Sequence, residues 1–134
     1  MTKVLVFGTF DGLHLGHEAF LAQAQELADK VIVCVAPDAV VELLKQRKPQ
    51  FVLEQRLEAL SELPMVSRAV AGDPELGNYE CYRQVKPDLV AFGYDQTELE
   101  KDFKRFQQAT GDETPTIVLK PYQPETFKSS LLRE

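Results

Sequence analysis

The amino-acid sequence predicts an α/β fold: a single Rossmann-like, doubly wound domain with a parallel five-stranded sheet in the order 3-2-1-4-5. Short apolar runs rich in β-branched residues alternate with longer segments of helical periodicity along almost the whole chain. The 134 residues, 44% of them hydrophobic, suit one domain and are enough to bury one core. No internal repeat, low-complexity stretch or linker divides the chain, so we expect one domain over residues 1–134.

Five segments are predicted to be buried strands because each is a short apolar run bounded by glycine, proline or aspartate. These strands are expected at residues 3–7, 31–36, 68–71, 89–92 and 116–119. Strands that alternate regularly with helices are parallel and joined by right-handed crossovers, which is the connection of a doubly wound sheet.

Helical spacing of apolar residues predicts the intervening helices. They are expected at residues 17–29, 39–46, 54–63, 78–85 and 98–110. In the first of them one apolar face is formed by Phe20, Leu21, Ala24, Leu27 and Ala28. The segments 48–52, 72–77 and 121–126 contain proline or glycine and are predicted to be loops within the domain.

The acidic balance of the chain excludes some classes of function. A formal net charge of −6 and a pI near 5.0 do not fit the basic stripe of a nucleic-acid-binding protein. The apolar run 4–7 is too short for a signal sequence or a membrane span, so we expect a cytoplasmic protein without a membrane partner. Cys34 and Cys81 lack the spacing of metal sites or disulfide frameworks and are predicted to be packing residues in a reducing compartment.

Two loops lie where a ligand is expected. In doubly wound sheets, ligands bind beyond the carboxyl ends of the strands, where the strand order reverses. Residues 8–16 follow the first predicted strand, and residues 93–96 follow the fourth. The first of these loops contains His14 and is followed directly by His17, and these are the two histidines of the chain.

The chemistry of the first loop suits phosphate. Residues 8–17 have the sequence GTFDGLHLGH, and the helix predicted from His17 points its free amides and positive dipole end back at the loop. Imidazole groups donate hydrogen bonds to phosphate oxygens at neutral pH. An Asp-Gly turn or one capping histidine has an ordinary structural explanation, but the whole string between a strand and a helix favours a functional site.

The same string resembles the T/HxGH signature of the nucleotidylyltransferase superfamily, the cytidylyltransferase-like group. Its members include glycerol-3-phosphate cytidylyltransferase, pantetheine-phosphate adenylyltransferase and the archaeal-type FAD synthetases. The resemblance extends along the chain, because residues 54–56 (EQR), 86–88 (KPD) and 93–96 (GYDQ) also have counterparts. It implies transfer of a nucleoside monophosphate from an NTP to a phosphorylated acceptor, with release of pyrophosphate.

The resemblance also implies roles for single residues. His14 is expected to contact the α-phosphate, His17 the α- and β-phosphates, and Thr9 the acceptor phosphate. Gly8, Phe10 and Gly16 would complete the nucleotide site. Lys45 and Arg56 are expected to neutralise phosphates as catalytic residues, Arg56 as a bidentate clamp. Asp11 is placed at the acceptor site, where it orients a donor or lies near Mg²⁺ that the NTP carries, with no metal ligand directly from the protein.

Two further segments are predicted to contact the nucleotide. Gly93, Tyr94 and Asp95 are expected at the base and ribose, and the GYDQ string is especially similar to the archaeal-type FAD synthetases. Ser129 and Ser130 resemble the family's S-T-T-K segment, which closes over the triphosphate. The family's arginine and following lysine are missing there, and Lys120 or Lys128 is the candidate substitute.

The predicted reaction is FMN plus ATP giving FAD. The alternative within the enzyme class is CTP with glycerol 3-phosphate or a similar phospho-alcohol. The alternative from another class is a nucleotide-binding sensor without catalysis. Acceptor selection is expected in the loops 48–53 and 72–77. Phe51, Tyr79 and Tyr122 are the aromatic candidates for stacking on an isoalloxazine ring. A homodimer is expected because related enzymes usually pair.

Overall fold

The structure is a computed structural model, and it describes residues 2–74 and 77–120. Its centre is a five-stranded sheet in the order β3-β2-β1-β4-β5, with every neighbouring pair parallel. The strands are β1 (Lys3–Gly8), β2 (Lys30–Val35), β3 (Arg68–Ala71), β4 (Leu89–Phe92) and β5 (Thr116–Val118). The predicted fold class and strand order are therefore confirmed.

Five helices connect the strands: α1 (Leu15–Gln25), α2 (Asp38–Lys45), α3 (Leu53–Ser61), α4 (Glu80–Val85) and α5 (Thr97–Thr110). Helix α1 begins two residues before the prediction because His14 is its N-cap. It ends earlier than predicted because the amide of Leu27 donates to the carbonyl of Ala24, which closes a tighter final turn. Helix α4 begins late because Tyr79 has a left-handed backbone, with φ of 54°.

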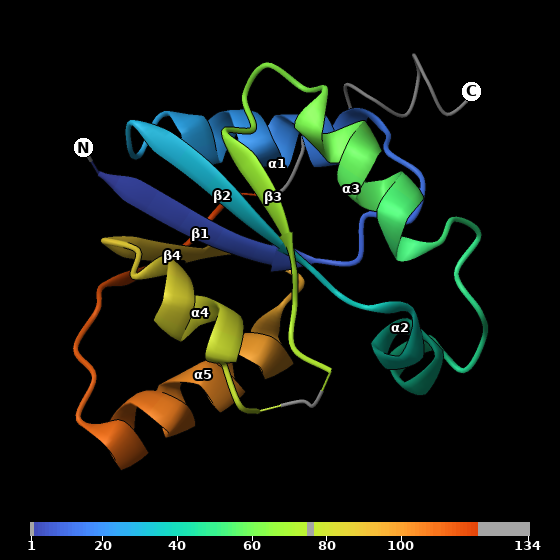
Figure 1. The fold of residues 1–134 in the computed structure, drawn as a ribbon. Coiled ribbons are helices and arrows are strands. Elements are labelled where there is room, and N and C mark those ends of the chain that lie inside the picture. Colours follow the sequence, from blue (N-terminus) through green and yellow to red (C-terminus); the bar gives the residue numbers. More distant parts are fainter. Residues whose placement is uncertain (1, 75–76, 121–134) are drawn as a thin grey trace.

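Helices α1 and α3 cover one face of the sheet, and α4 and α5 cover the other (Figure 1). Alternate residues of β1 supply both cores: Val4 and Val6 pack with α1 and α3, and Leu5 packs with α4 and α5. All three side chains are fully buried, and each contributes about 2 kcal/mol of hydrophobic stabilisation. β1 is therefore buried on both faces of the sheet and contributes side chains to both cores.

The apolar face predicted for α1 is present, since Leu21 and Ala24 are buried and Phe20, Leu27 and Ala28 pack beside them. Cys34 and Cys81 are both free thiols buried in the second core, as predicted for packing residues. Within residues 2–74 and 77–120, no helix is long and apolar enough to cross a membrane.

Candidate active site

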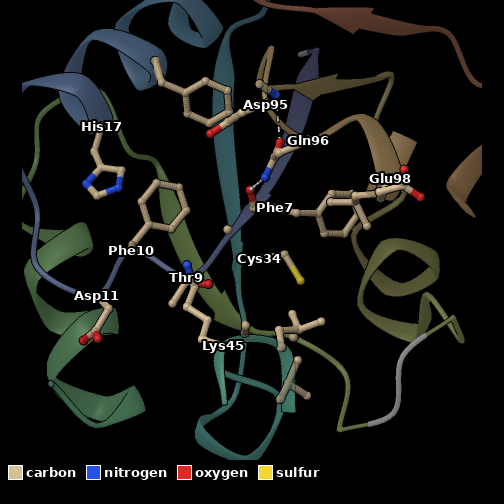
Figure 2. Close-up of a pocket in the computed structure, with 18 of the residues that line it drawn as sticks. Phe7, Thr9, Phe10, Asp11, His17, Cys34, Lys45, Asp95, Gln96 and Glu98 are labelled. Carbon is tan, nitrogen blue, oxygen red and sulfur yellow. Dashed lines mark hydrogen bonds between the residues drawn. The ribbon is translucent and has the colours of Figure 1, made fainter. Parts of the chain in front are cut away.

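An open cleft runs across the carboxyl ends of the strands, where the connections from β1 and β4 leave in opposite directions. It has a volume of about 1690 Å³, more than the 300–1,000 Å³ or so typical of a pocket for one small ligand. Residues from both predicted loops surround the opening (Figure 2). Eleven of the predicted site residues line it: Gly8, Thr9, Phe10, Asp11, His14, Gly16, His17, Lys45, Gly93, Tyr94 and Asp95.

The first loop is shaped by the ring of Phe10. The backbone of Phe10 is left-handed, with φ of 51°, and its side chain is buried. A Cβ atom on Gly8 would lie only 2.4 Å from this ring, so the chain needs a glycine there. The Phe10 ring also packs against His17, with 5.2 Å between the ring centroids. Phe10 is therefore a support for a histidine as well as a lining residue.

The two histidines cap α1 reciprocally. The amide of Gly16 donates to Nδ1 of His14 at 3.0 Å, and the amide of His14 donates to Nδ1 of His17 at 3.3 Å. The two rings stack with centroids 3.9 Å apart. Because each Nδ1 accepts a hydrogen bond, each neutral ring carries its proton on Nε2. Both Nε2–H groups lack a protein partner among the described residues and can donate to a ligand in the cleft.

The environment of His17 keeps this ring neutral. Burial, then the neighbouring His14, lowers the pKa of His17 to about 4, although Asp95 acts in the opposite direction. The site therefore offers hydrogen-bond donors at neutral pH without requiring a charged His17. Gly16 makes the pairing possible, because a Cβ atom at this position would lie 2.8 Å from Cε1 of His14.

The amides of α1 differ from the prediction that they are free for an anion. Gly16 donates to the His14 ring, and the amides of His17 and Glu18 both donate to the carbonyl of His14. The Nε2–H groups of the two imidazoles, rather than these three amides, are therefore the donors available to a ligand. The positive end of the α1 dipole still faces the cleft, since His14 and Gly16 line it.

Asp11 joins the first loop to the segment between α2 and α3. One carboxylate oxygen accepts from the amide of Gln50 at 2.7 Å and the other from that of Phe51 at 2.8 Å. Burial acts to raise the pKa of Asp11, but these amides, with Arg56 and Arg47, outweigh it and lower the pKa. The carboxylate is ionised and engaged with the protein, which fits a loop-positioning role and leaves little for direct substrate contact.

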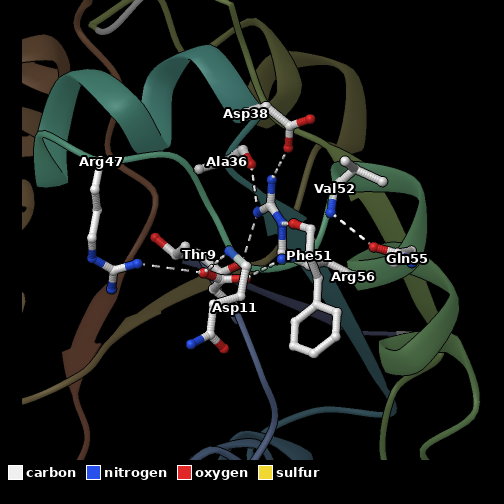
Figure 3. A network of polar contacts seen from close by, with 10 residues as sticks. Thr9, Asp11, Ala36, Asp38, Arg47, Phe51, Val52, Gln55 and Arg56 are labelled. Atoms are coloured by element: carbon white, nitrogen blue, oxygen red, sulfur yellow. Dashed lines mark hydrogen bonds and ion pairs between the residues drawn. The ribbon is translucent and has the colours of Figure 1, made fainter.

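Arg56 does not occupy the position predicted for a phosphate clamp. Its side chain is 1% exposed and does not line the cleft. The guanidinium donates to three carbonyls, those of Phe51 (2.9 Å), Thr9 (2.9 Å) and Ala36 (2.7 Å), and to the Asp38 carboxylate at 2.6 Å (Figure 3). Three loops are thereby held by one buried side chain. The structure corrects the prediction: Arg56 positions the loops around the cleft and is committed to protein acceptors.

Two exposed cations of the cleft come from α2 and the segment after it. Lys45 is the last residue of α2, lines the cleft and has no carboxylate partner among the described residues. The positive charge of Lys45 contributes to the lowered pKa of His17, so the two side chains are close enough to interact electrostatically. Arg47 also lines the cleft and lies 4.0 Å from Asp11. Lys45 therefore remains the cation predicted to neutralise a phosphate.

Gln96 is a site residue that the sequence-based list omits. Its Oε1 accepts from the amide of Gly93 at 2.7 Å, and its Nε2 donates to the carbonyl of Phe7 at 2.9 Å. The side chain therefore fastens the loop after β4 to the end of β1 (Figure 2). A glutamine before a helix gives no local signal for this role, because its partner Phe7 lies 89 residues earlier.

The end of the described chain also reaches the cleft. The side chain of Gln23 on α1 exchanges two hydrogen bonds with the backbone of Lys120, at 3.0 and 3.1 Å. Lys120 lines the cleft, so one candidate substitute for the missing family cation is near the site. The predicted roles of Tyr122, Lys128, Ser129 and Ser130 lie outside the described residues. Within residues 2–74 and 77–120, no cluster of three or more His, Cys, Asp or Glu side chains could hold a metal ion.

A parallel sheet in this order, with paired histidine donors at the start of the first helix, defines a nucleotide-binding α/β domain. The chain belongs to the cytidylyltransferase-like family, whose sequence profile matches residues 5–134.

Two curated relatives illustrate the similarity. The FAD synthase of Thermococcus sibiricus is 44% identical over 94 residues, which cover 70% of this chain and 64% of the relative. The FAD synthase of Pyrococcus horikoshii is 38% identical over 120 residues, which cover 90% and 80% of the two chains. The matched part spans slightly less than two thirds of the first of these relatives.

Solved structures agree with the fold. The lipopolysaccharide core biosynthesis protein of Thermoplasma volcanium superposes with a TM-score of 0.83 at 32% identity, over 92% of this chain and 99% of that one. A pantoate-beta-alanine ligase from Francisella tularensis superposes with a TM-score of 0.65 at 19% identity, over 92% and 61%. The second likeness concerns the fold alone.

Proposed function

We propose that this chain transfers the adenylyl group of ATP to the phosphate of FMN, forming FAD and pyrophosphate. The observation that carries the proposal is the reciprocal cap of His14 and His17, which occupies both Nδ1 atoms and leaves two Nε2–H donors for a ligand. The naming of several relatives as FAD synthase supports the choice of nucleotide and acceptor.

In the proposed reaction, an ionised oxygen of the FMN phosphate attacks the α-phosphorus of ATP. The new P–O bond forms as the bond between the α-phosphorus and the bridging oxygen to the β-phosphate breaks. Pyrophosphate leaves with that electron pair. No protein nucleophile or base is required, so catalysis consists of alignment and stabilisation of charge on the phosphates.

The residues divide this work according to their positions. His14 and His17 donate to the α- and β-phosphates, and Lys45 neutralises the acceptor phosphate beside Thr9. Arg56 and Asp11 hold the loops in place through their hydrogen bonds to loop backbone. Mg²⁺ enters with ATP as part of the substrate, since this ion usually keeps water and phosphate ligands. Asp95 is an exposed carboxylate of the cleft that can accept from those waters or from the ribose.

The shape and polarity of the cleft favour FMN over a small phospho-alcohol. Apolar side chains of Pro37, Val40 and Leu44 line the cleft near Lys45, and Tyr79 and Cys81 line it further along. Leu44 is 57% exposed. An apolar ring that covers this side chain removes apolar surface from water, which is favourable. Glycerol 3-phosphate has no group that would cover these side chains, whereas the isoalloxazine of FMN does.

The test is a matrix of ATP or CTP with FMN or glycerol 3-phosphate, assayed for pyrophosphate and by chromatography for the dinucleotide. We expect pyrophosphate and FAD in equal amounts from ATP plus FMN alone. Product from CTP and glycerol 3-phosphate would transfer the proposal to that reaction. Nucleotide-dependent thermal stabilisation without pyrophosphate under any pairing would favour a sensor. The cytoplasmic location and the homodimer stay predictions.

A further inference from the structure

The cleft has two ends with different charge. At the end formed by the first loop, the lining carries three cations, Lys45, Arg47 and Lys120, and the two histidines, against two carboxylates, Asp11 and Asp95. At the end formed by α4, α5 and Asp73, the described residues of the lining carry the carboxylates of Asp73, Glu98 and Asp102 and one cation, Arg105. The first end suits polyphosphate. The second end repels a further phosphate and suits an uncharged group that has hydrogen-bond donors as well as acceptors.

At the second end, Asp102 and Arg105 form an ordered polar pair on α5. The Arg105 guanidinium donates to Oδ1 of Asp102 from Nη2 at 2.8 Å and from Nε at 3.1 Å. The buried hydroxyl of Tyr79 donates to Oδ2 of Asp102 at 2.6 Å. These hydrogen bonds, first from Tyr79 and then from Arg105, lower the pKa of Asp102, so the carboxylate stays ionised.

This pair retains capacity for a ligand. Nη1 of Arg105 has no protein partner among the described residues, and the Arg105 side chain is 61% exposed. Asp102 keeps one acceptor position at Oδ2, because a carboxylate oxygen has two lone pairs and, within the described part of the chain, Oδ2 accepts only from Tyr79. Its side chain is 40% exposed. The pair on α5 therefore offers a ligand one donor, Nη1 of Arg105, and one acceptor, Oδ2 of Asp102.

We propose that Arg105 and Asp102 recognise the polar edge of the isoalloxazine ring of FMN and so determine acceptor specificity. This inference rests on the proposed function. The ring's pyrimidine edge presents a carbonyl, an N–H and a second carbonyl in a row. Arg105 donates to a carbonyl of this edge, and Asp102 accepts from its N–H.

The pair lies further along α5 than the loop beside His17. Helix α5 starts at Thr97, immediately after the loop that faces His17. Arg105 lies eight residues further along, or about 12 Å at the rise of an α-helix. A ribityl chain and a three-ring system can extend from a phosphate near Lys45 toward this end. Cys34 and Cys81 also line the cleft and would cover the dimethylbenzene part of the ring.

The test compares Arg105→Gln with Lys104→Gln. Both variants remove one positive charge from α5, but Lys104 is outside the cleft and pairs with Glu100 at 3.4 Å. Binding of FMN alone is measured by quenching of its fluorescence, and the KM for ATP is measured in the full reaction. We expect Arg105→Gln to weaken FMN binding about tenfold, the usual effect of one charged hydrogen bond, with the KM for ATP unchanged. FMN methylated at the ring N3 should bind the wild-type chain about tenfold more weakly than FMN.

Two outcomes would overturn the inference: equal FMN affinity in Arg105→Gln and the wild type, or an equal loss in Lys104→Gln. Either result leaves the proposed function standing, provided the wild-type chain makes FAD from FMN and ATP. A wild-type chain that neither quenches FMN fluorescence nor makes FAD removes the proposed function and the inference together. Thermal melts of both variants exclude misfolding as the cause of weaker binding.

Discussion

The histidine pair and the buried arginine beside it are both rich in hydrogen-bond donors, yet they differ in where those donors point. His14 and His17 use their Nδ1 atoms as acceptors within the cap and leave Nε2 for a ligand. Arg56 directs its guanidinium to the carbonyls of Thr9, Ala36 and Phe51 and to Asp38. The histidine pair is left able to bind a ligand, whereas Arg56 holds the surrounding loops in place.

This difference has a simple physical cause. A buried guanidinium is stable only when its donors are satisfied, so the surrounding carbonyls compete successfully with any ligand. The histidines are less buried, and each ring satisfies one nitrogen locally while the other meets the cleft. Burial and existing partners therefore determine whether a donor-rich residue near a phosphate site binds the ligand or holds the protein in place. The residue type alone does not determine this.

The largest effect is expected for Arg56→Leu, which keeps the bulk of the side chain but leaves three carbonyls without donors. We expect the free energy of unfolding to fall by about 4 kcal/mol, measured by urea denaturation. Arg47→Gln is the matched control, because Arg47 is exposed and its pair with Asp11 is long at 4.0 Å. Its expected loss is below about 0.5 kcal/mol. An Arg56→Leu chain as stable as the control would contradict the holding role.

The histidines should show the opposite behaviour, with a large effect on catalysis and a small one on folding. In His14→Asn the amide oxygen can still cap α1, as asparagine commonly does, but the donor at Nε2 is lost. We expect kcat to fall about a hundredfold to a thousandfold with the unfolding midpoint nearly unchanged. His14→Gln places a donor closer to the original Nε2 and should recover part of the rate. Equal rates in the wild type and His14→Asn would remove His14 from the mechanism.

A smaller effect is expected at the fastening between β1 and the loop after β4. In Gln96→Glu, one carboxylate oxygen still accepts from Gly93, but the other faces the carbonyl of Phe7 instead of donating to it. We expect the KM for ATP to rise about tenfold, equivalent to about 1.4 kcal/mol, with a smaller change in kcat. A larger fall in kcat than rise in KM would indicate that this loop acts in the chemical step.

The smallest effect is the pH dependence of stability that comes from His17. Its pKa is lowered from 6.5 to about 4 in the folded chain, so between these values the unfolded chain binds more protons. The contribution of the neutral ring to stability is therefore complete above about pH 6.5 and is lost as the pH falls toward 4. With a discount for the partial exposure of the ring, we expect about 1 kcal/mol. Denaturation at pH 7 and pH 4.5 should show a smaller acid loss in His17→Asn than in the wild type.

The sequence predicts the folded core well because its signals are local. The burial of Val4, Leu5 and Val6 on two faces follows from an unbroken apolar strand, which is typical of a parallel sheet. The GTFDGLHLGH string likewise predicts a ligand loop between a strand and a helix, and the structure places that loop at the cleft. The start of α1 was harder to predict, since a histidine cap is not among the usual capping residues.

By itself, then, the sequence determined the order of strands and helices, the parallel sheet and the position of the histidine loop, because periodicity and short motifs act over a few residues. Only the tertiary structure decided that Arg56 holds loops, that Gln96 fastens the loop after β4 to β1 and that Asp11 faces backbone amides. Their partners lie far off in the chain, 47 residues for Arg56 and Thr9 and 89 for Gln96 and Phe7. Which donors remain free for a ligand depends on the acceptors that folding brings beside them, and those contacts leave no local pattern in the sequence.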